Sequence, residues 1–581
     1  GKTPTALRAQ AGRWSQWLSQ TSDLNWESVL GAAGLNRVHF KTRAALEAQS
    51  REHALDLLGS LIQEEANPSI TISGDSVGDK IAFLFPGQGS QCLNMGAGLY
   101  ASIPVFKQAL DEVCSFIDTH LEKPLLSVMH AVEDSEEHSL LHQTSYTQPA
   151  LFAVEVAMAR LWISWDVLPD FFIGHSIGEL SAAHMSGVLS LEDAARLVCA
   201  RGKLMQSCQS GGAMASLEAT ESEVKSALSA VSGAVDIAGL NGARQTVISG
   251  DSDAVDTICA EFKEQGRKAT RLNVSHAFHS AHMESVLDDF RKVAQSCVFK
   301  SPGIPVVSNL TGTMASAEEL MSPDYWVRHV REAVRFSDGM EALYDAGARI
   351  FLECGPQRTL AGMGRKCLGD APAVFVSSHR KGKDEAKTLV QALSKLHVAG
   401  ASVAWENLMG PGSQWVDLPT YAFQRQHYWL PVSQNRGGRS LGKTSIWSLA
   451  GEALVLPGGG ELYRVDIGPG VQSYLGDHRV YGRVVVPGAF YVAVMISVAA
   501  SRWPDHAVEL SEVQFVEALW FDDARSALPM HIHVEPTDDE RLKVTLAAQH
   551  DGVWRTHAKG FMAANSESKR APFPIAEHHD V

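Results

Sequence analysis

The segment FFIGHSIGELSAAHM, residues 171–185, decides the fold of the central part of the chain. Its first four residues form a short apolar run of the kind that fills a buried parallel strand. The spacing after Gly178 predicts a helix that continues to about Met185. Between strand and helix lies Gly174-His175-Ser176-Ile177-Gly178, a G-x-S-x-G sequence. Glycines on both sides of Ser176 permit the sharp turn that lifts a serine hydroxyl clear of a sheet.

Ser176 is therefore a candidate nucleophile. The next backbone N–H, on Ile177, lies at a predicted helix N-terminus, where developing negative charge is stabilised. A serine hydroxyl also needs a base, and the segment SHAFHSAH (275–282) offers histidines directly after a predicted strand. An ordinary strand-to-helix turn with hydrogen-bonded structural histidines is the alternative interpretation of the same residues.

A second glycine-rich turn, FPGQGSQ (85–91), follows the apolar run IAFLF (81–85), which predicts the first strand of the same domain. The turn lacks the Lys-Ser/Thr pair of a phosphate loop and the third glycine of a dinucleotide-binding fingerprint. Its backbone N–H groups could face Ser176 as part of an oxyanion hole, or the segment could be a structural turn.

Strands and helices alternate from residue 81 to about 206, which indicates α/β organisation. Residues 212–275 instead predict the order strand, helix, strand, strand, helix, strand, which is that of a ferredoxin-like unit. Within it we expect a helix capping box at Thr220 and Glu223, a turn at Asn241-Gly242 and a helix cap at Ser252. The α/β pattern then resumes with three apolar runs: IPVVSNL (304–310), ARIFLEC (348–354) and AVFVSS (373–378).

The two ends of the chain differ from this central part. Apolar residues at helical spacing predict helices over 5–20 and 43–65, a small helical cap before the polar stretch 67–80. The aromatic-rich segment 418–430 and the Gly/Ser/Arg-rich linker 433–445 precede a predicted α+β domain. Its expected elements are one apolar helix (489–500) and the strands LYRVDIG (462–468), RVVVP (483–487), LKVTLAAQH (542–550) and VWRTHAKGFM (553–562).

Length and composition limit the function classes. The 581 residues correspond to about four domains at roughly 150 residues each. With 45% apolar and 20% charged residues, the composition is that of a globular protein. The net charge of −16 argues against nucleic acid or an anionic membrane as the main partner. The eight cysteines form no disulfide-type or zinc-type pattern, and no signal peptide or membrane span is evident, so we expect a cytoplasmic segment of a longer protein, without a metal site.

Eight sequence blocks in fixed order resemble the acyltransferase domain of modular type I polyketide synthases and the related malonyl transferases of fatty acid synthesis. They are FPGQGSQ (85–91), YTQPALFA (146–153), GHSIGE (174–179), ARGKLMQ (200–206), GAMA (212–215), NGARQTVISG (241–250), HAFHS (276–280) and FLECGPQRTL (351–360). The resemblance extends outward. Residues 1–75 resemble the ketosynthase-to-acyltransferase linker domain, 418–430 resembles the post-acyltransferase segment that packs back on it, and LGDHRVYGRVVVP (475–487) resembles the HxxxGxxxxP motif of polyketide synthase dehydratases.

The resemblance implies four sections. They are a linker domain (1–78), an acyltransferase domain (79–380) with a ferredoxin-like subdomain at about 208–276, a post-acyltransferase linker (381–445) and the N-terminal hotdog half of a dehydratase (446–581). The expected fold class is α/β: an α/β-hydrolase-like acyltransferase core with an inserted ferredoxin-like subdomain, preceded by a small α/β linker domain and followed by a partial α+β hotdog domain.

The resemblance also implies roles for individual residues. Ser176 becomes the nucleophile that attacks the thioester of an acyl-coenzyme A, and His279, the last residue of HAFH, becomes its general base. A backbone carbonyl orients the base in this family. The backbone N–H groups of Gln88 and Ile177 become the oxyanion donors.

Substrate choice is implied in the same way. Arg201 matches the arginine that binds the free carboxylate of a malonyl-type substrate, and Gln148, His276 and Phe278 are further candidate substrate-binding residues. Malonyl-selective relatives resemble HAFH, whereas methylmalonyl-selective ones typically carry YASH and a Gln in place of Ile177. Because Phe278 would fill the space for a 2-methyl branch, we expect malonyl-coenzyme A.

The expected acceptor is the phosphopantetheine thiol of an acyl carrier protein, and no metal or bound cofactor is implied. An upstream ketosynthase and the remaining dehydratase half are the other expected partners. His478 matches the dehydratase histidine, but the acid from the second hotdog is missing, so we expect no dehydration by this segment alone. A serine hydrolase and a non-catalytic scaffold that docks neighbouring domains remain the alternatives.

Overall fold

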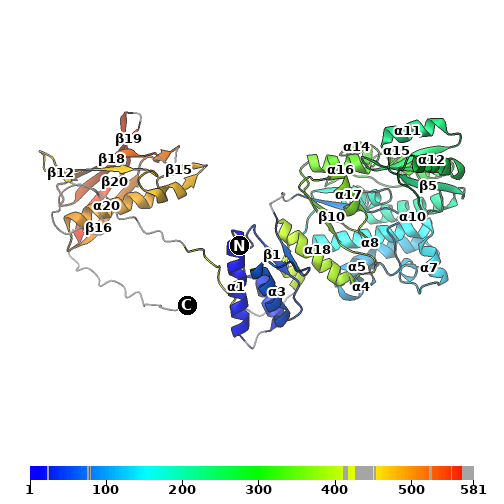
Figure 1. The fold of residues 1–581 in the computed structure, drawn as a ribbon, viewed down its shortest axis with the longest axis horizontal. Helices are drawn as coiled ribbons and strands as arrows, with labels where there is room; N and C mark the ends of the chain where they lie inside the picture. The colour runs from blue at the N-terminus through cyan, green and yellow to red at the C-terminus, as the bar shows by residue number, and fades with distance from the viewer. Residues whose placement is uncertain are drawn as a thin grey trace. The chain divides into compact units, whose positions relative to one another are not determined.

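The computed structural model describes residues 1–21, 25–74, 78, 80–409, 416–425, 449, 453–522, 526–550 and 552–565. The chain forms two compact units, Gly1–Gln424 and Arg425–Val581 (Figure 1). Each unit has its own hydrophobic core. The predicted linker 433–445 and the last five residues of the predicted aromatic segment lie outside the described residues.

A five-stranded parallel sheet forms the centre of the first unit, with the strand order β11-β10-β3-β4-β9. Each strand lies within an apolar run that the sequence assigns to a strand. Because β3 and β4 are parallel neighbours, their glycine-rich turns leave the same edge of the sheet. The strands are β3 (Ile81–Phe85), β4 (Phe171–Gly174), β9 (Val306–Val307), β10 (Ile350–Glu353) and β11 (Val374–Ser377).

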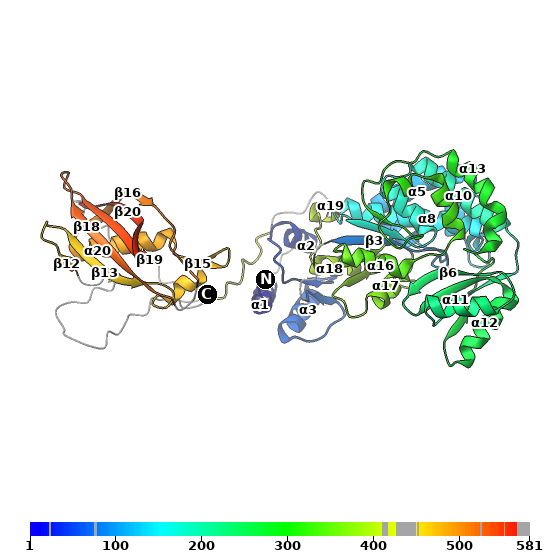
Figure 2. The ribbon, with the colours of Figure 1, turned by 90° about the horizontal axis from the view of Figure 1, so that it is seen from above.

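Helices cover both faces of this sheet (Figure 2). Alternate residues of β3 face the two sides: Phe83 and Phe85 belong to one core, and Ala82 and Leu84 to the other. Burial on both faces explains why the strands are continuous apolar runs, and the predicted α/β class is confirmed. The first face packs against α5 (Pro104–Ile117), α8 (Thr144–Ser164), α9 (Gly178–Met185) and α10 (Leu191–Ser207), and the second against α16 (Phe336–Asp345) and α17 (Leu360–Leu368).

Shorter helices connect these elements. They are α4 (Ala97–Ser102), η1 (Asp118–His120), α6 (Leu125–Met129), α7 (Glu136–Leu141), η2 (Ala281–Val286), α13 (Leu287–Gln295), α14 (Ala317–Leu320) and α15 (Pro323–Arg331).

An inserted antiparallel sheet of order β6-β7-β5-β8 follows α10 and forms the predicted ferredoxin-like unit. The capping box of Thr220 and Glu223 is present. The predicted turn at Asn241-Gly242 is wrong, because β6 continues through Gly242 and Asn241 instead places its Oδ1 2.9 Å from His175 Nε2. The predicted cap Ser252 is the first residue of its helix. The elements are β5 (Gly212–Leu217), α11 (Glu221–Ala230), β6 (Val235–Gly242), β7 (Gln245–Asp251), α12 (Ser252–Glu264) and β8 (Ala269–Arg271).

The N-terminal residues form three helices and a two-stranded antiparallel sheet. The prediction of a single helix over 43–65 is wrong for its first third: residues 44–46 pair as a strand, and Ser50 caps the helix that follows by accepting the His53 N–H. A second helix, over Trp26–Leu35, was not predicted. The elements are α1 (Pro4–Gln20), α2 (Trp26–Leu35), β1 (Ala44–Leu46), α3 (Arg51–Gln63) and β2 (Ile70–Ile72).

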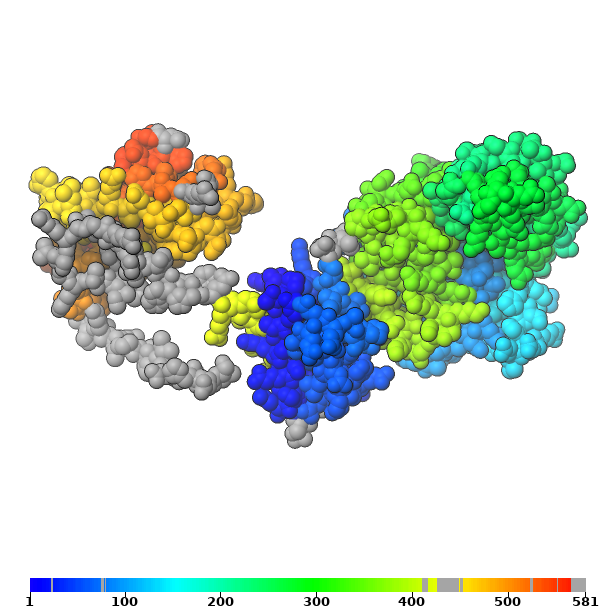
Figure 3. All heavy atoms as spheres, viewed as in Figure 1, coloured from blue at the N-terminus to red at the C-terminus, as the bar shows by residue number. Residues whose placement is uncertain are grey.

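Residues 416–422 lie against these N-terminal residues, and Figure 3 shows this part of the chain in yellow against their blue surface. Arg13 donates to the carbonyl of Tyr421, and Arg37 donates to the carbonyls of Leu418 and Pro419. The described part of the predicted aromatic segment therefore packs back on the N-terminal residues, as the resemblance implied.

Helix α18 (Glu385–Ala399) is tied to the central domain by its first residue. The Glu385 carboxylate accepts the N–H groups of Gly96 and Leu99 at 2.8 and 3.0 Å, at the start of α4, and lies 2.9 Å from His379 Nε2. Burial alone would raise the pKa of Glu385, but the hydrogen bond and charge of His379 hold it below its ordinary value. The carboxylate thus caps one helix while belonging to another. A short helix, α19 (Trp405–Met409), follows α18.

The second unit folds an antiparallel sheet of order β12-β13-β18-β19-β20-β16 around one buried helix, α20 (Gly488–Arg502). This is the hotdog arrangement that the resemblance implied. Two of its long strands, over 507–515 and 528–536, were not predicted from the sequence. The other elements are β12 (Ala453–Val455), β13 (Glu461–Ile467), η3 (Ser473–Asp477), β14 (Arg479–Val480), β15 (Arg483–Val485), β16 (Ala507–Phe515), β17 (Trp520–Phe521), β18 (Leu528–Pro536), β19 (Leu542–His550) and β20 (Val553–Asn565).

Replacing Glu385 by alanine should destabilise the first unit by about 2–4 kcal/mol, because two backbone N–H groups and His379 lose their partner in a mostly buried position. Calorimetry of the full chain measures this as a lower unfolding temperature for that unit. Alanine at the exposed Glu406 of α19 is the matched control. Equal unfolding temperatures for the two variants would contradict the capping role.

Candidate active site

The turn between β4 and α9 holds Ser176 in an unusual backbone conformation. Its φ angle is 53°, in the left-handed region that non-glycine residues rarely adopt. A Cβ on Gly174 would lie 2.0 Å from the Glu179 nitrogen, and a Cβ on Gly178 would lie 2.1 Å from the Phe85 carbonyl oxygen. Only glycine fits at both positions, so strand β3 and helix α9 approach each other closely around the serine.

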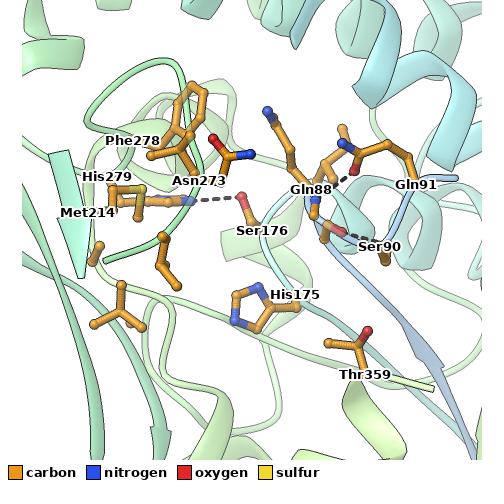
Figure 4. A pocket seen from close by; sticks show the side chains of 18 of the residues that line it. Gln88, Ser90, Gln91, His175, Ser176, Met214, Asn273, Phe278, His279 and Thr359 are labelled. Carbon is orange, nitrogen blue, oxygen red and sulfur yellow. Dashed lines mark hydrogen bonds between the residues drawn. The ribbon is translucent and has the colours of Figure 1, made fainter. Parts of the chain in front are cut away.

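Ser176 and His279 meet although 103 residues separate them in the sequence. The distance from Ser176 Oγ to His279 Nε2 is 2.7 Å (Figure 4). On the other side of the ring, His279 Nδ1 lies 2.9 Å from the backbone carbonyl oxygen of Glu332. A proton on Nδ1 donated to that carbonyl leaves the Nε2 lone pair free to accept the serine proton. The geometry is that of a serine–histidine pair oriented by a backbone carbonyl.

Helix α10 brings a cation to the same hydroxyl. Arg201 Nη2 lies 3.1 Å from Ser176 Oγ, and the side chain is 1% exposed. Among the residues that the structure describes, the Nε and Nη1 atoms of Arg201 have no hydrogen-bond partner. Burial lowers the pKa of Arg201 to about 9, while the charge of Glu179 raises it. A buried guanidinium with two unused donors is suited to an anionic group of a ligand.

Two residues of neighbouring turns, Gln88 and Ile177, have backbone N–H groups without a partner in the described structure. Both residues line the same cavity as Ser176. The N–H of Ser176 itself is occupied, since it donates to Asn309 Oδ1 at 2.7 Å. The two N–H groups are thus left for a ligand in this cavity to accept.

A cavity of about 800 Å³ opens over Ser176 and is lined by Gln148, Met205 and Phe278 among others (Figure 4). The Gln148 side chain is buried, with Nε2 3.4 Å from Met205 Sδ and Oε1 unpaired within the described structure. His276, which the resemblance implied as a substrate-binding residue, does not line this cavity. Its ring is 3% exposed, and its Nδ1 lies 2.8 Å from Ser275 Oγ.

The histidines around the serine are biased toward their neutral forms. Burial, followed by the charge of Arg201, holds the pKa of His279 well below its ordinary value. Burial also lowers the pKa of His175. A neutral His279 is the form that can accept a proton from Ser176.

Sequence reasoning missed three residues of this site. The Glu332 carbonyl carries no side-chain signal at all. Asn309 hydrogen-bonds to both sides of the Ser176 turn, and its only signal is a polar residue near the end of a predicted strand. Glu179 is fully buried and accepts hydrogen bonds from the Tyr325 hydroxyl and the Asn309 N–H. A charged residue on an otherwise apolar helix start was the available clue to Glu179.

His478, the predicted dehydratase histidine, belongs to the second unit, where it is exposed and its Nδ1 lies 2.6 Å from the Val485 carbonyl. No described helix is both long and apolar enough to cross a membrane. The described residues also contain no cluster of three or more histidine, cysteine and acidic side chains that could hold a metal ion.

Two known families match the chain. Residues 82–403, more than half of the sequence, match the acyl transferase domain family, and residues 448–549 match the polyketide synthase dehydratase domain family. The chain is 42% identical over 577 residues to the mycoketide-CoA synthase of Mycobacterium tuberculosis, and 38% identical over 585 residues to polyketide synthase GfsA of Streptomyces halstedii. These alignments cover 98% and 97% of this chain but only 14% and 8% of the relatives, so the chain spans a small part of each.

Solved structures lead to the same family. The acyltransferase domain from the second module of the salinomycin polyketide synthase is 43% identical, with a TM-score of 0.62 over 73% of this chain and 98% of that one. The acyltransferase domain of ZmaA is 30% identical, with a TM-score of 0.66 over 72% of this chain and 97% of that one. The chain therefore belongs to the acyltransferase domains of type I polyketide synthases and continues into the N-terminal part of a dehydratase domain.

Proposed function

We propose that this protein transfers a malonyl group from malonyl-coenzyme A, through an ester on Ser176, to the phosphopantetheine thiol of an acyl carrier protein. One observation carries the proposal. The Ser176 hydroxyl lies 2.7 Å from a neutral base, His279, and 3.1 Å from a buried guanidinium, Arg201. The histidine supports nucleophilic attack, and the guanidinium supports an acyl group that carries its own negative charge.

In the first half-reaction, Ser176 Oγ attacks the thioester carbonyl while its proton passes to His279 Nε2. The Glu332 carbonyl holds the Nδ1 proton of the resulting imidazolium. The oxyanion of the tetrahedral intermediate accepts the N–H groups of Gln88 and Ile177. The carbon–sulfur bond then breaks, and the coenzyme A thiolate leaves with the proton from His279. The product is a malonyl ester of Ser176.

The second half-reaction reverses these steps with a different thiol. His279 takes the proton of the carrier's phosphopantetheine thiol, the sulfur attacks the seryl ester, and Ser176 recovers its proton as it leaves. The acyl carrier protein is thus the proposed partner, with an upstream ketosynthase in the parent synthase. No step uses a metal or a bound cofactor.

Arg201 distinguishes the transferase from a serine hydrolase. Its unpaired Nε and Nη1 are charged donors that an anionic acyl group could accept, whereas a hydrolase of neutral esters gains nothing from a buried cation beside its nucleophile. Held by its carboxylate, the malonyl group keeps its ester carbonyl over the two backbone donors. Gln148, with an unpaired Oε1 in the same cavity, is proposed as a further polar contact to the substrate.

Phe278 and Ile177 favour malonyl over methylmalonyl. Phe278 lines the cavity next to His279, and its proposed role is to fill the space that a 2-methyl branch would need. Rejection of one methyl group by such a pocket is worth about 1–3 kcal/mol. His276 packs near the Phe278 ring, with ring centroids 5.9 Å apart, so its proposed contribution is to support that ring.

Residues 446–581 are proposed not to catalyse dehydration alone. A family dehydratase pairs its histidine with an aspartate from a second hotdog. In the described part of the second unit, the partner of the His478 ring is the backbone carbonyl of Val485, at Nδ1, and not a carboxylate.

Incubation of the protein with malonyl-coenzyme A should add one malonyl group, visible by intact mass, and Ser176→Ala should abolish the adduct. Alanine at the exposed Ser115 is the control and should retain it.

In a competition, malonyl-coenzyme A should label the protein about ten times faster than methylmalonyl-coenzyme A. If the parent protein takes up no malonyl group, the non-catalytic scaffold is the interpretation that remains. If methylmalonyl-coenzyme A labels the protein faster, the proposed exclusion of a 2-methyl branch by Phe278 is wrong.

Arg201→Ala should lower kcat/KM for malonyl-coenzyme A by about 10- to 100-fold, the cost of losing a charged hydrogen-bonding partner. Acylation by acetyl-coenzyme A, which has no free carboxylate, should be unchanged or faster. Arg196→Ala, on the same helix but paired with Glu192 and Asp193 at the surface, controls for general effects on α10. Unchanged malonyl selectivity in Arg201→Ala would contradict the proposed role.

The acid limb of Ser176 acylation should lie below pH 6.5, the ordinary pKa of histidine. Because the pKa of His279 is lowered, the imidazole stays neutral and able to accept the serine proton down to a lower pH than a solvated histidine would. Single-turnover acylation measured from about pH 5 to about pH 8 gives the midpoint. A midpoint at or above 6.5 would show that burial and Arg201 do not control this base.

A further inference from the structure

The side chain of Asn309 bridges two residues of the turn that holds the nucleophile, Gly174 and Ser176. Its Oδ1 accepts the N–H of Ser176 at 2.7 Å, and its Nδ2 donates to the carbonyl of Gly174 at 2.8 Å. Asn309 is 2% exposed and is not among the residues that line the cavity. Because both polar atoms of its side chain are used by the turn, Asn309 acts on the turn and has no side-chain donor or acceptor directed to a ligand.

The backbone of Asn309 is fixed as well. Its N–H donates to Glu179 Oε2 at 2.8 Å, and its carbonyl accepts the N–H of Arg335 at 2.8 Å. Glu179 is fully buried and also accepts the Tyr325 hydroxyl. Side chain and backbone together thus make four hydrogen bonds, which leaves the amide little freedom to rotate.

Two consequences follow for the nucleophile. Ser176 adopts a φ of 53°, a conformation that costs about 1–3 kcal/mol and persists only where surrounding contacts enforce it. The bridge from Asn309 is such a contact. In addition, a Ser176 N–H that donates to Asn309 is not available to an oxyanion, so the donors left are those of Ile177 and Gln88.

We propose that Asn309 is a positioning residue for acyl transfer: its amide holds the Ser176 turn in the reactive conformation and directs the oxyanion to the N–H groups of Ile177 and Gln88. This inference rests on the proposed function of Ser176. It concerns the reactivity of the serine and not the identity of the acyl donor, so the two can be tested apart.

Asn309→Asp is the decisive variant, because it preserves shape and the Oδ1 acceptor. When ionised, its second oxygen faces the Gly174 carbonyl, and the two acceptors repel each other. When protonated, the carboxyl can donate to that carbonyl and restore the bridge. Burial and the nearby Glu179 raise the pKa of a carboxyl at this place. The other titratable groups of the surrounding elements include His175, Arg201, Tyr325, His329 and Arg335.

The variant should therefore be active at mildly acid pH and lose activity as pH rises. Relative to the parent, its rate of Ser176 acylation should fall about tenfold between about pH 6 and about pH 8. The lowered pKa of His279 keeps the base neutral across this window. KM for malonyl-coenzyme A should change little, since Asn309 does not line the cavity.

Two readouts separate this inference from the proposed function. Intact mass follows malonyl transfer, and a fluorophosphonate probe follows the nucleophilicity of Ser176 without any acyl-coenzyme A. Asn407→Asp is the matched control, because the exposed Asn407 also donates its Nδ2 to a carbonyl, that of Ser164, at 2.9 Å. The control should follow the pH profile of the parent in both assays.

A profile for Asn309→Asp parallel to that of the parent in both assays would overturn the inference. A parent that reacts with the fluorophosphonate but takes no malonyl group would overturn the proposed donor and leave the Asn309 inference to be decided by the probe. Should Asn309→Asp fail to fold, Asn309→Ser decides: a loss of about tenfold or more in probe labelling at unchanged unfolding temperature supports the role, and parent-like labelling overturns it.

Discussion

The close approach of helix α9 to strand β3 at Gly178 is the constraint on which the candidate active site depends. A side chain at Gly178 would place its first carbon 2.1 Å from that oxygen and would force helix α9 away from strand β3. Because β3 and β4 are adjacent and parallel, the turns that follow them are neighbours. The close approach at Gly178 keeps these two turns together. Gln88 on one turn and Ile177 on the other then line the same cavity as Ser176.

Electrostatics inside the cavity follow from burial. Removal from water disfavours charged histidine, and the positive charge of Arg201 acts on His279 in the same direction. The result is one buried cation beside a neutral base. Gly202 allows this arrangement, since a Cβ there would lie 2.9 Å from the Thr144 carbonyl. Helix α10 can thus pack closely on α8, which brings Arg201 and Gln148 to the same region of the protein.

Sequence patterns predicted the elements that depend only on residues nearby in the chain. Elements and site residues that depend on tertiary contacts could not be predicted in this way. The strand, turn and helix around Ser176 could be predicted because two glycines and an apolar run suffice to define them, and Thr220 with Glu223 fixed a helix start in the same way. The proposed roles of His279 and Arg201 came from the resemblance, since nothing local distinguishes them from other histidines and arginines. Asn309 could not be foreseen because its function exists only where β9 lies beside β4. Residues 43–50 were misassigned because short strand β1 is defined by pairing with β2, far along the chain.

The register of the central sheet links core packing to catalysis. β3 and β4 pair with Leu84 opposite Ile173 and Phe85 opposite Gly174. A slip by one residue would shift the turns by about 3.3 Å, which exceeds the tolerance of a hydrogen bond to an oxyanion. With the Ser176 N–H already occupied by Asn309, no third donor could compensate. Phe85 and Phe172, whose tilted rings have centroids 5.8 Å apart, pack together on one face of these two strands and favour this register. In the proposed transfer, the core beneath the sheet therefore acts on the oxyanion through the positions of the two turns, although its side chains are buried away from the cavity.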